Sequence, residues 1–299
     1  MNWPDVWNAM FGGLADYGEI LALVSNSVVA GAVLGLVGGL VGVFVMQRDM
    51  AFAVHGISEL SFAGAAFALL VGFDVVTGSI VGSLLAAAII GVLGARARDR
   101  NSIIGVLMPF GLGLGILFLS LYEGRSANRF SLLTGQIVSV QSGQLGWLIV
   151  ISGFVLLGML LIWRPLRFDS LDPQSAAARG VPTTAVSLAF MLLLGLIVAV
   201  SVHIIGALLV MALLVTPAAA AMRIATGPIT VPALAAAFGF ASAVGGILLA
   251  IAGTLPVSPY ITTISFVIYL VCRAIGARRD RGTRATERSP SRRPLRAAR

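Results

Sequence analysis

The feature that most constrains this chain is a series of nine long apolar segments joined by short polar connections. Each has about the 17 to 25 residues that an α-helix needs to cross the hydrocarbon core of a bilayer. A lipid interior offers no partners for free backbone groups, so segments of this length cross it as helices. The sequence therefore predicts an all-α polytopic transmembrane bundle of about nine spans in the plasma or inner membrane. The segments lie at 22–46, 51–72, 75–95, 103–122, 145–163, 184–201, 204–221, 231–252 and 257–274.

The distribution of charge predicts how this bundle sits in the membrane. Only 11% of the residues are charged, against about 25% in soluble domains. With the N-terminus outside and the C-terminus cytoplasmic, all arginines of the connections except Arg125 and Arg129 face the cytoplasm, as the positive-inside rule requires. We expect an extracellular N-terminal segment at 1–20, a transmembrane domain at 21–275 and a disordered, arginine-rich cytoplasmic tail at 276–299.

Composition also argues against several functions. The chain contains no lysine, so it cannot carry a conventional phosphate-binding loop of the Walker type, and any ATPase must be another chain. Cys272 is the single cysteine, which excludes an internal disulfide framework and a cysteine-based metal cluster. Half of the arginines lie between Arg273 and Arg299, so the net charge of +8 reflects a solvated tail, or one that binds anionic lipid, and no nucleic-acid surface. We expect no covalent catalysis.

The connection after the fifth segment contains a short helix of its own. Asp172 occupies an N-cap position, Pro173 the first helical position, and Gly180 with Pro182 ends the helix. This pattern fits either an ordinary loop helix or a surface on which a cytoplasmic partner docks. The predicted element consists of Asp172, Pro173, Gln174, Ser175, Ala176, Ala177, Ala178, Arg179 and Gly180.

Four blocks of the sequence resemble the permease subunit of bacterial zinc and manganese ABC importers. They are "ELSFAG", "RNSIIGVLMPFGLGLGILFLS", "FDSLDPQSAAARGVP" and "IIGALLVMALLVTPAAAAMR", and they occur in that order between residues 30 and 273. The resemblance implies two permease subunits paired with two cytoplasmic ATPases, and an extracellular binding protein that delivers the metal. It also implies that the helix at 172–180 transmits closure of the ATPases to the spans.

The second span holds an ionisable pair, His55 and Glu59, which the sequence places near the middle of the segment. Such groups cost at least about 2.5 kcal/mol at a helix centre in lipid, so they face a cavity or pair with each other. At positions i and i+4 they lie on one helix face, and both are ligand types for Zn²⁺ or Mn²⁺. The pair therefore contacts metal or fixes helix packing.

The resemblance favours metal contact. Members of the family carry an Asp and a His one turn apart before the same glycine, Gly64 in this sequence. Here His55 stands in place of the Asp and Glu59 in place of the His, which keeps one nitrogen and one carboxylate ligand. Two ligands make an incomplete site, so the others are expected from other spans, the paired subunit or water.

Two further residues are candidates for a metal entrance at the outer surface. His203 lies near the outer ends of the sixth and seventh spans, and Asp74 follows the second span. Each also has an ordinary explanation, since an interfacial histidine can act as a cap and a loop carboxylate is normally solvated.

The resemblance implies import of a divalent transition metal, zinc first and manganese second, as cargo and with no tightly bound cofactor. The chain would form half of a homodimeric pore. Two alternatives stay open: a permease for a metal chelate or vitamin, and a secondary transporter that uses the His/Glu pair as a proton relay without an ATPase.

Overall fold

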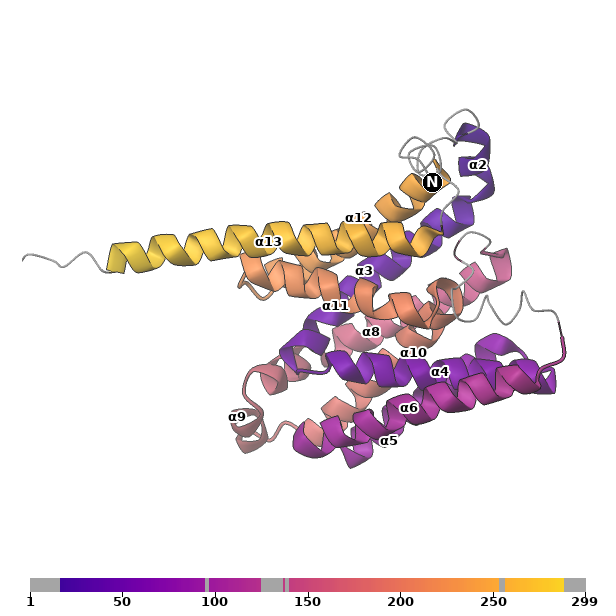
Figure 1. Ribbon diagram of the computed structural model, residues 1–299. Helices are drawn as coiled ribbons and strands as arrows, with labels where there is room; N and C mark the ends of the chain where they lie inside the picture. Colours follow the sequence, from indigo (N-terminus) through magenta and orange to yellow (C-terminus); the bar gives the residue numbers. More distant parts are fainter. Residues whose placement is uncertain (1–16, 95–96, 125–136, 138–139, 253–255, 288–299) are drawn as a thin grey trace, which may run out of the picture.

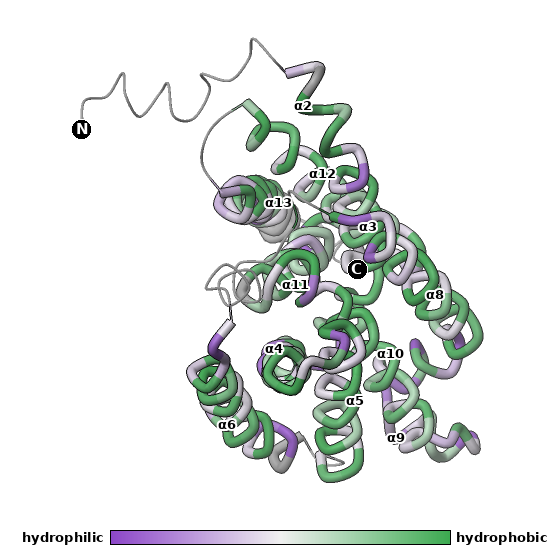
Figure 2. Tube along the Cα trace, turned by 90° about the vertical axis from the view of Figure 1, so that its right-hand side faces the viewer, coloured by the Kyte–Doolittle hydropathy of each residue, from purple (hydrophilic) through white to green (hydrophobic). Residues whose placement is uncertain are grey.

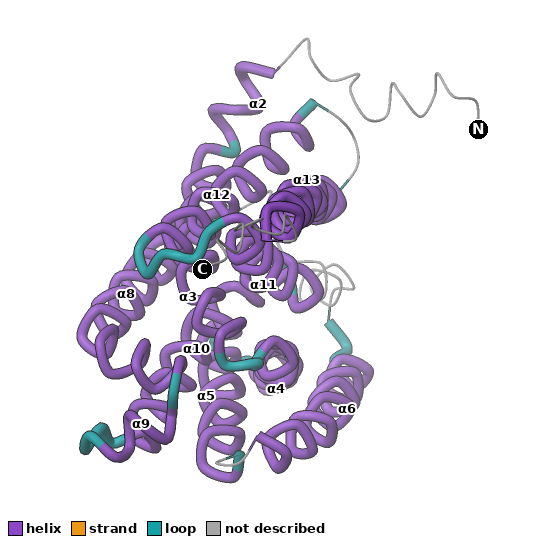
Figure 3. Tube along the Cα trace, turned by 90° about the vertical axis from the view of Figure 1, so that its left-hand side faces the viewer, coloured by secondary structure: helices purple, strands orange, loops and turns teal. Residues whose placement is uncertain are grey.

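The computed structural model describes residues 17–94, 97–124, 137, 140–252 and 256–287, and this part of the chain is helical with short turns and contains no strand (Figure 3). The expected all-α bundle is confirmed. The helices are α2 (Tyr17–Leu23), α3 (Ser25–Gln47), α4 (Ala51–Val71), α5 (Val75–Leu93), α6 (Ala97–Leu121), α8 (Ser142–Leu171), α9 (Pro173–Ala178), α10 (Thr183–Ile205), α11 (Ala207–Ile224), α12 (Thr230–Ile251) and α13 (Val257–Glu287).

Eight helices of the described residues are long and apolar enough to cross a membrane. The remaining expected span corresponds to α11, whose apolar part Leu209–Ile224 is shorter. α11 packs against α3, α12 and α13, so it lies within the bundle like the longer helices. The spans alternate in direction, so that α3, α5 and α11 end on the side of the bundle where α9 lies (Figure 1). The side of the membrane that this end faces stays a prediction.

The spans form two groups that share an interface. One group contains α3, α11, α12 and α13, the other contains α4, α5, α6 and α10, and α8 packs against both α3 and α10 (Figures 1 and 2). Figure 2 shows that hydrophobic residues cover most of each span, while hydrophilic residues gather toward the helix ends. This pattern is expected for helices whose outer faces contact lipid.

Glycines allow neighbouring spans to approach until their backbones touch. A Cβ at Gly64 of α4 would overlap the carbonyl oxygen of Gly78 in α5, and one at Gly39 of α3 would overlap that of Ala235 in α12. In α6, a Cβ at Gly111 would lie 3.0 Å from the backbone nitrogen of Leu60 in α4. Small residues drive helix association in lipid by permitting this contact. α4 is thus held closely by α5 and α6.

Two helices extend further than the sequence predicts. α8 runs from Ser142 to Leu171, whereas the sequence predicts a span at 145–163. Its 30 residues make a helix about 45 Å long, so it projects beyond a hydrocarbon layer of about 30 Å. α13 continues to Glu287, into the segment expected to be disordered. Ala and Arg are strong helix formers, and a helix already nucleated in the membrane propagates at little cost.

A single residue separates α10 from α11. Gly206 has φ 82° and ψ 154°, a conformation that side-chain-bearing residues rarely adopt. α10 therefore continues to Ile205, past the predicted boundary at 201, and α11 starts at Ala207. This break places His203 in the last turn of α10.

Replacement of Gly64 by Ala should destabilise the bundle by about 1–3 kcal/mol, because the added methyl forces α4 away from α5. Thermal unfolding in detergent measures the effect. Gly153→Ala is the matched control, since a Cβ at Gly153 of α8 meets open space. Equal melting temperatures for the two variants would contradict close α4–α5 packing.

Candidate functional site

The side chains of His55 and Glu59 lie next to each other on one face of α4. Their Nε2 and Oε1 atoms lie 3.6 Å apart, and the side chains are 29% and 6% exposed. α4 starts at Ala51, so at about 1.5 Å per residue both side chains lie in the half of the helix nearer Arg48. Glu59 is the ninth of the 21 residues of α4 and lies close to the middle of the span, and His55 lies one turn nearer its start.

The surroundings of the pair leave it one accessible side. Ser58 Oγ donates a hydrogen bond to the carbonyl oxygen of His55 at 2.9 Å, and the backbone of Glu59 packs against Gly111 of α6. His55 Nδ1 is buried and has no hydrogen-bond partner among the described residues. Glu59 is thus almost enclosed, while the partly exposed imidazole remains accessible to an ion.

The described residues contain no group of three or more His, Cys, Asp or Glu side chains that could hold a metal ion. A protein zinc site usually has at least three protein ligands, and manganese takes more oxygen ligands still. If the pair on α4 binds metal, further ligands must come from outside the described residues of this chain.

The two entrance candidates lie together at the opposite end of the bundle. Asp74 and His203 are close enough to influence each other electrostatically. His203 Nε2 also lies 3.1 Å from Nε2 of Gln144 in α8, a neighbour that sequence reasoning missed because Gln144 precedes the predicted span. The structure thus brings together polar side chains from the first turn of α8, the last turn of α10 and the start of α5.

Asp74 also has a structural role, because it is the N-cap of α5. Its Oδ2 accepts hydrogen bonds from Thr77 N at 2.8 Å and Thr77 Oγ1 at 2.7 Å. Partial burial acts to raise the pKa of Asp74, but these hydrogen bonds and the proximity of His203 outweigh it, so the pKa lies below its ordinary value. The carboxylate is ionised at neutral pH and can attract cations.

The short helix α9 has the capped form that the sequence predicts. Asp172 Oδ1 accepts a hydrogen bond from Ser175 N at 3.0 Å, Pro173 is the first residue of α9, and Gly180 has φ 82°. The helix ends at Ala178 with Arg179 as C-cap, and Ala176 is fully buried against α8 and α10. α9 is therefore docked onto the bundle on one face and exposed on the other.

A buried ion pair next to α9 is absent from the sequence predictions. Arg48 Nη1 donates to Asp169 Oδ2 at 2.6 Å, and Arg48 Nη2 donates to Ser187 Oγ at 2.9 Å. The Arg48 and Asp169 side chains are 11% and 4% exposed. From the sequence alone, Arg48 was one of the arginines expected in the cytoplasmic connections, and no partner was assigned to it. The sequence feature that could have indicated a partner for Arg48 was Asp169, an acidic residue three positions before the capping Asp172.

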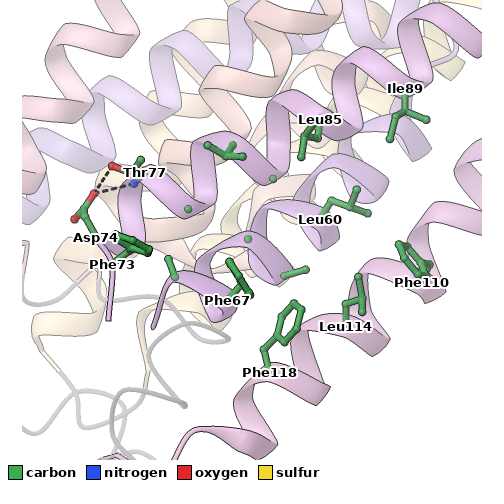
Figure 4. A pocket seen from close by; sticks show the side chains of 16 residues that line it. Leu60, Phe67, Phe73, Asp74, Thr77, Leu85, Ile89, Phe110, Leu114 and Phe118 are labelled. Atoms are coloured by element: carbon green, nitrogen blue, oxygen red, sulfur yellow. Dashed lines mark hydrogen bonds between the residues drawn. The ribbon is translucent and has the colours of Figure 1, made fainter. Parts of the chain in front are cut away.

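A separate cavity of about 670 Å³ lies between α4, α5 and α6 (Figure 4). Its wall is almost entirely apolar, with Phe67, Phe110 and Phe118 on one side and Asp74 with Thr77 at one end. His55 and Glu59 do not line it. The cavity has the chemistry of a lipid-facing recess and does not provide a path for a hydrated cation.

These features define a class of protein, a multi-pass helical membrane protein with an ionisable pair inside one span. Comparison with known proteins gives the family: residues 21–276 match the ABC 3 transport family, and the chain belongs to it.

Individual relatives agree in sequence and in fold. The chain is 30% identical to the manganese transport system membrane protein MntC of Halalkalibacterium halodurans, over 75% of this chain and 77% of that protein. It is 28% identical to the manganese import system permease protein ScaB of Streptococcus parasanguinis, over 83% and 89%. The solved structure "PsaBC from Streptococcus pneumoniae in complex with Fab" matches with a TM-score of 0.77 and 27% identity, covering 87% of this chain and 95% of that chain.

Loss of the Asp172 cap should loosen α9. Hydrogen bonds from the Ser175 hydroxyl and amide lower the pKa of Asp172, so the ionised cap stabilises α9 at neutral pH and is lost as the pH falls below about 4. Amide hydrogen exchange, corrected for intrinsic rates, should show faster exchange across Pro173–Ala178 in Asp172→Ala at pH 7. In the wild type the same change should appear only in acid.

Asp172→Asn is the control, because Asn caps helices as well as Asp but does not titrate. Its exchange should match the wild type at pH 7 and stay constant in acid. Equal exchange in Asp172→Ala and the wild type at pH 7 would show that α9 does not depend on this cap.

Proposed function

We propose that this chain is the membrane permease of an ATP-driven importer of a divalent transition metal ion, manganese ahead of zinc. Membership of the ABC 3 transport family supports the class of transporter. The order of the metals reverses the expectation from the sequence, because the relatives named for a metal are manganese transport proteins. Zinc remains the second candidate, since a nitrogen and a carboxylate ligand suit both ions.

The observation that carries this proposal is the His55–Glu59 pair. An enclosed carboxylate beside an accessible imidazole offers one hard oxygen ligand and one nitrogen ligand on a helix face. A cation bound between the two side chains would contact both the carboxylate and the imidazole, which lie 3.6 Å apart. Binding by two protein ligands is weak, and weak binding is what a transport site needs in order to release its cargo.

The incomplete ligand set supports a pore formed by two copies of the chain. If the accessible side of the pair faces the same side of a second copy, a metal ion between them meets two imidazoles and two carboxylates. Twofold symmetry makes such an arrangement self-complementary. Water supplies further ligands for Mn²⁺, which prefers more oxygen atoms than Zn²⁺.

The energy for transport comes in this proposal from separate ATPase chains, because a chain without lysine lacks the phosphate-binding loop that hydrolysis requires. These ATPases dock on the exposed face of α9 at the arginine-rich end. An extracellular binding protein delivers the metal at the other end, where Asp74 and His203 lie. The chain itself moves an ion by alternating access and makes or breaks no covalent bond.

Uptake of radioactive manganese and zinc tests the proposal in cells that lack their own high-affinity importers and express this chain with its ATPase and binding protein. Glu59→Gln should reduce uptake by at least about 10- to 100-fold at matched surface expression, as expected for a lost metal ligand. Glu123→Gln, an exposed carboxylate at the end of α6, is the control and should transport normally. Normal uptake by Glu59→Gln would assign the pair to helix packing.

Reversing the order of the two ligand types, from His and Glu to Asp and His, distinguishes metal binding from packing more sharply. His55→Asp alone and Glu59→His alone should each lose uptake, whereas the double variant regains a nitrogen and a carboxylate and should recover it. No manganese or zinc uptake by the wild type would favour the chelate alternative. Uptake that is driven by a proton gradient and independent of the ATPase would favour the secondary transporter.

A further inference from the structure

The contacts of α9 attach it firmly to the last turn of α8. The Arg179 guanidinium lies 5.6 Å from the centre of the Phe168 ring, and Ala176 is fully buried. Only Asp172 separates α8 from α9, and this residue caps α9 while its own amide closes the last turn of α8. A displacement of α9 therefore displaces the end of α8, which carries Asp169.

Arg48, the partner of Asp169, lies in the short turn that joins α3 to α4. Only Asp49 and Met50 separate Arg48 from Ala51, the first residue of α4. Asp49 has φ 51°, and the buried Met50 donates its amide hydrogen to Val45 O at 2.9 Å. This turn has little freedom to absorb movement, so a force on Arg48 reaches the start of α4.

The Arg48 side chain is held on an aromatic base. Its guanidinium lies 5.8 Å from the centre of the Phe190 ring, and Phe44 packs against Phe190 and Trp163 with ring-centre distances of 6.2 Å and 5.0 Å. The planar guanidinium can stack on a ring and donate in two directions at once, which an ammonium group cannot do in the same way. Arg48 thereby links α3, α8 and α10 in a defined geometry.

A polar cavity of about 380 Å³ adjoins the pair and gives these groups room to shift. Arg48, Asp169 and Ser187 line it, together with Arg100 of α6. Arg100 Nη2 donates to the carbonyl oxygen of Arg48 at 3.1 Å, so the turn is also tied to α6. The ion pair thus lies between α9, whose exposed face is the proposed docking surface for the ATPases, and α4, which carries His55 and Glu59.

We propose that the Arg48–Asp169 ion pair is the contact through which movement of α9 is passed to α4 and so to His55 and Glu59. Both are positioning residues, since neither touches the cargo, and the inference rests on the proposed function. A purely stabilising role explains the pair less well, because buried ion pairs are often no more stabilising than apolar residues of the same volume. A contact that passes movement from the end of α8 to the start of α4 needs the directional hydrogen bond that the charged groups of Arg48 and Asp169 form.

The test compares metal transport with ATP hydrolysis in proteoliposomes that hold the chain with its ATPase and binding protein. Arg48→Ala and Asp169→Ala should lower the number of ions moved per ATP by roughly 5- to 150-fold, the usual range of coupling between sites. ATP hydrolysis should persist. The charge-reversed double variant Arg48→Asp with Asp169→Arg should recover much of the ratio. Arg164→Ala, an exposed arginine of α8, is the control.

An unchanged ratio in the single variants would overturn the inference. A proportional loss of transport and hydrolysis leaves this ratio unchanged and would overturn the inference as well, because it indicates only that a smaller fraction of the protein is folded. A folded double variant that stays as uncoupled as the single variants would overturn it as well.

A second measurement separates this inference from the proposed function, because it needs no metal. Phe52, at the start of α4, is 67% exposed, so Phe52→Cys in a Cys272→Ser background gives one reactive thiol. Its rate of maleimide labelling should differ between the ATP-bound and ADP-bound complex, and Arg48→Ala should abolish that difference. A nucleotide effect that persists in Arg48→Ala, or one that is absent from the wild type, would overturn the inference. A wild type that shows the effect but moves no metal would refute only the proposed cargo.

Discussion

Backbone contact between α4 and its two neighbours determines much of what this molecule can do. A side chain at Gly64 would overlap α5, and one at Gly111 would press on the backbone of α4 beside Glu59. In a bilayer, where apolar burial does not distinguish helix from lipid, such close packing is a main source of association between helices. It fixes the helix that carries the ionisable pair, and it leaves only the accessible side of His55 for an ion or for another chain.

The candidate functional features are distributed along α4, from its start to its end. Its start is joined through Arg48 to α8 and α10, and its end leads into Asp74, the cap of α5. His55 and Glu59 lie between, nearer to the arginine-rich end. A helix tied at one end to the helices around α9 and at the other to the cluster of Asp74, His203 and Gln144 suits the proposed alternating access. Small displacements at either end change the surroundings of the pair.

The family match and the individual residues constrain the function in different ways. Residues 21–276 belong to the ABC 3 transport family, which gives the class of transporter and the general course of the chain. In the proposed function the choice of cargo depends on a few ligands, and the candidate ligands along α4 are a nitrogen first and a carboxylate second. Because the same ligand types serve several metals, relatives named for manganese guide the choice of cargo more than the residues themselves do.

The sequence by itself determined the helical class, the spans and the capped form of α9, because these depend on local hydrophobicity, length and capping chemistry that neighbouring residues carry. It also identified His55 and Glu59, since ionisable residues are costly in lipid and stand out in an apolar segment. It could not show that α8 and α13 continue past their apolar segments. The length of an apolar segment indicates only the part of a helix that lies in lipid, and it does not indicate where the helix ends. Only the tertiary structure paired Arg48 with Asp169 and brought Gln144 to His203, since contacts between residues more than fifty positions apart are decided by helix packing and leave no local pattern.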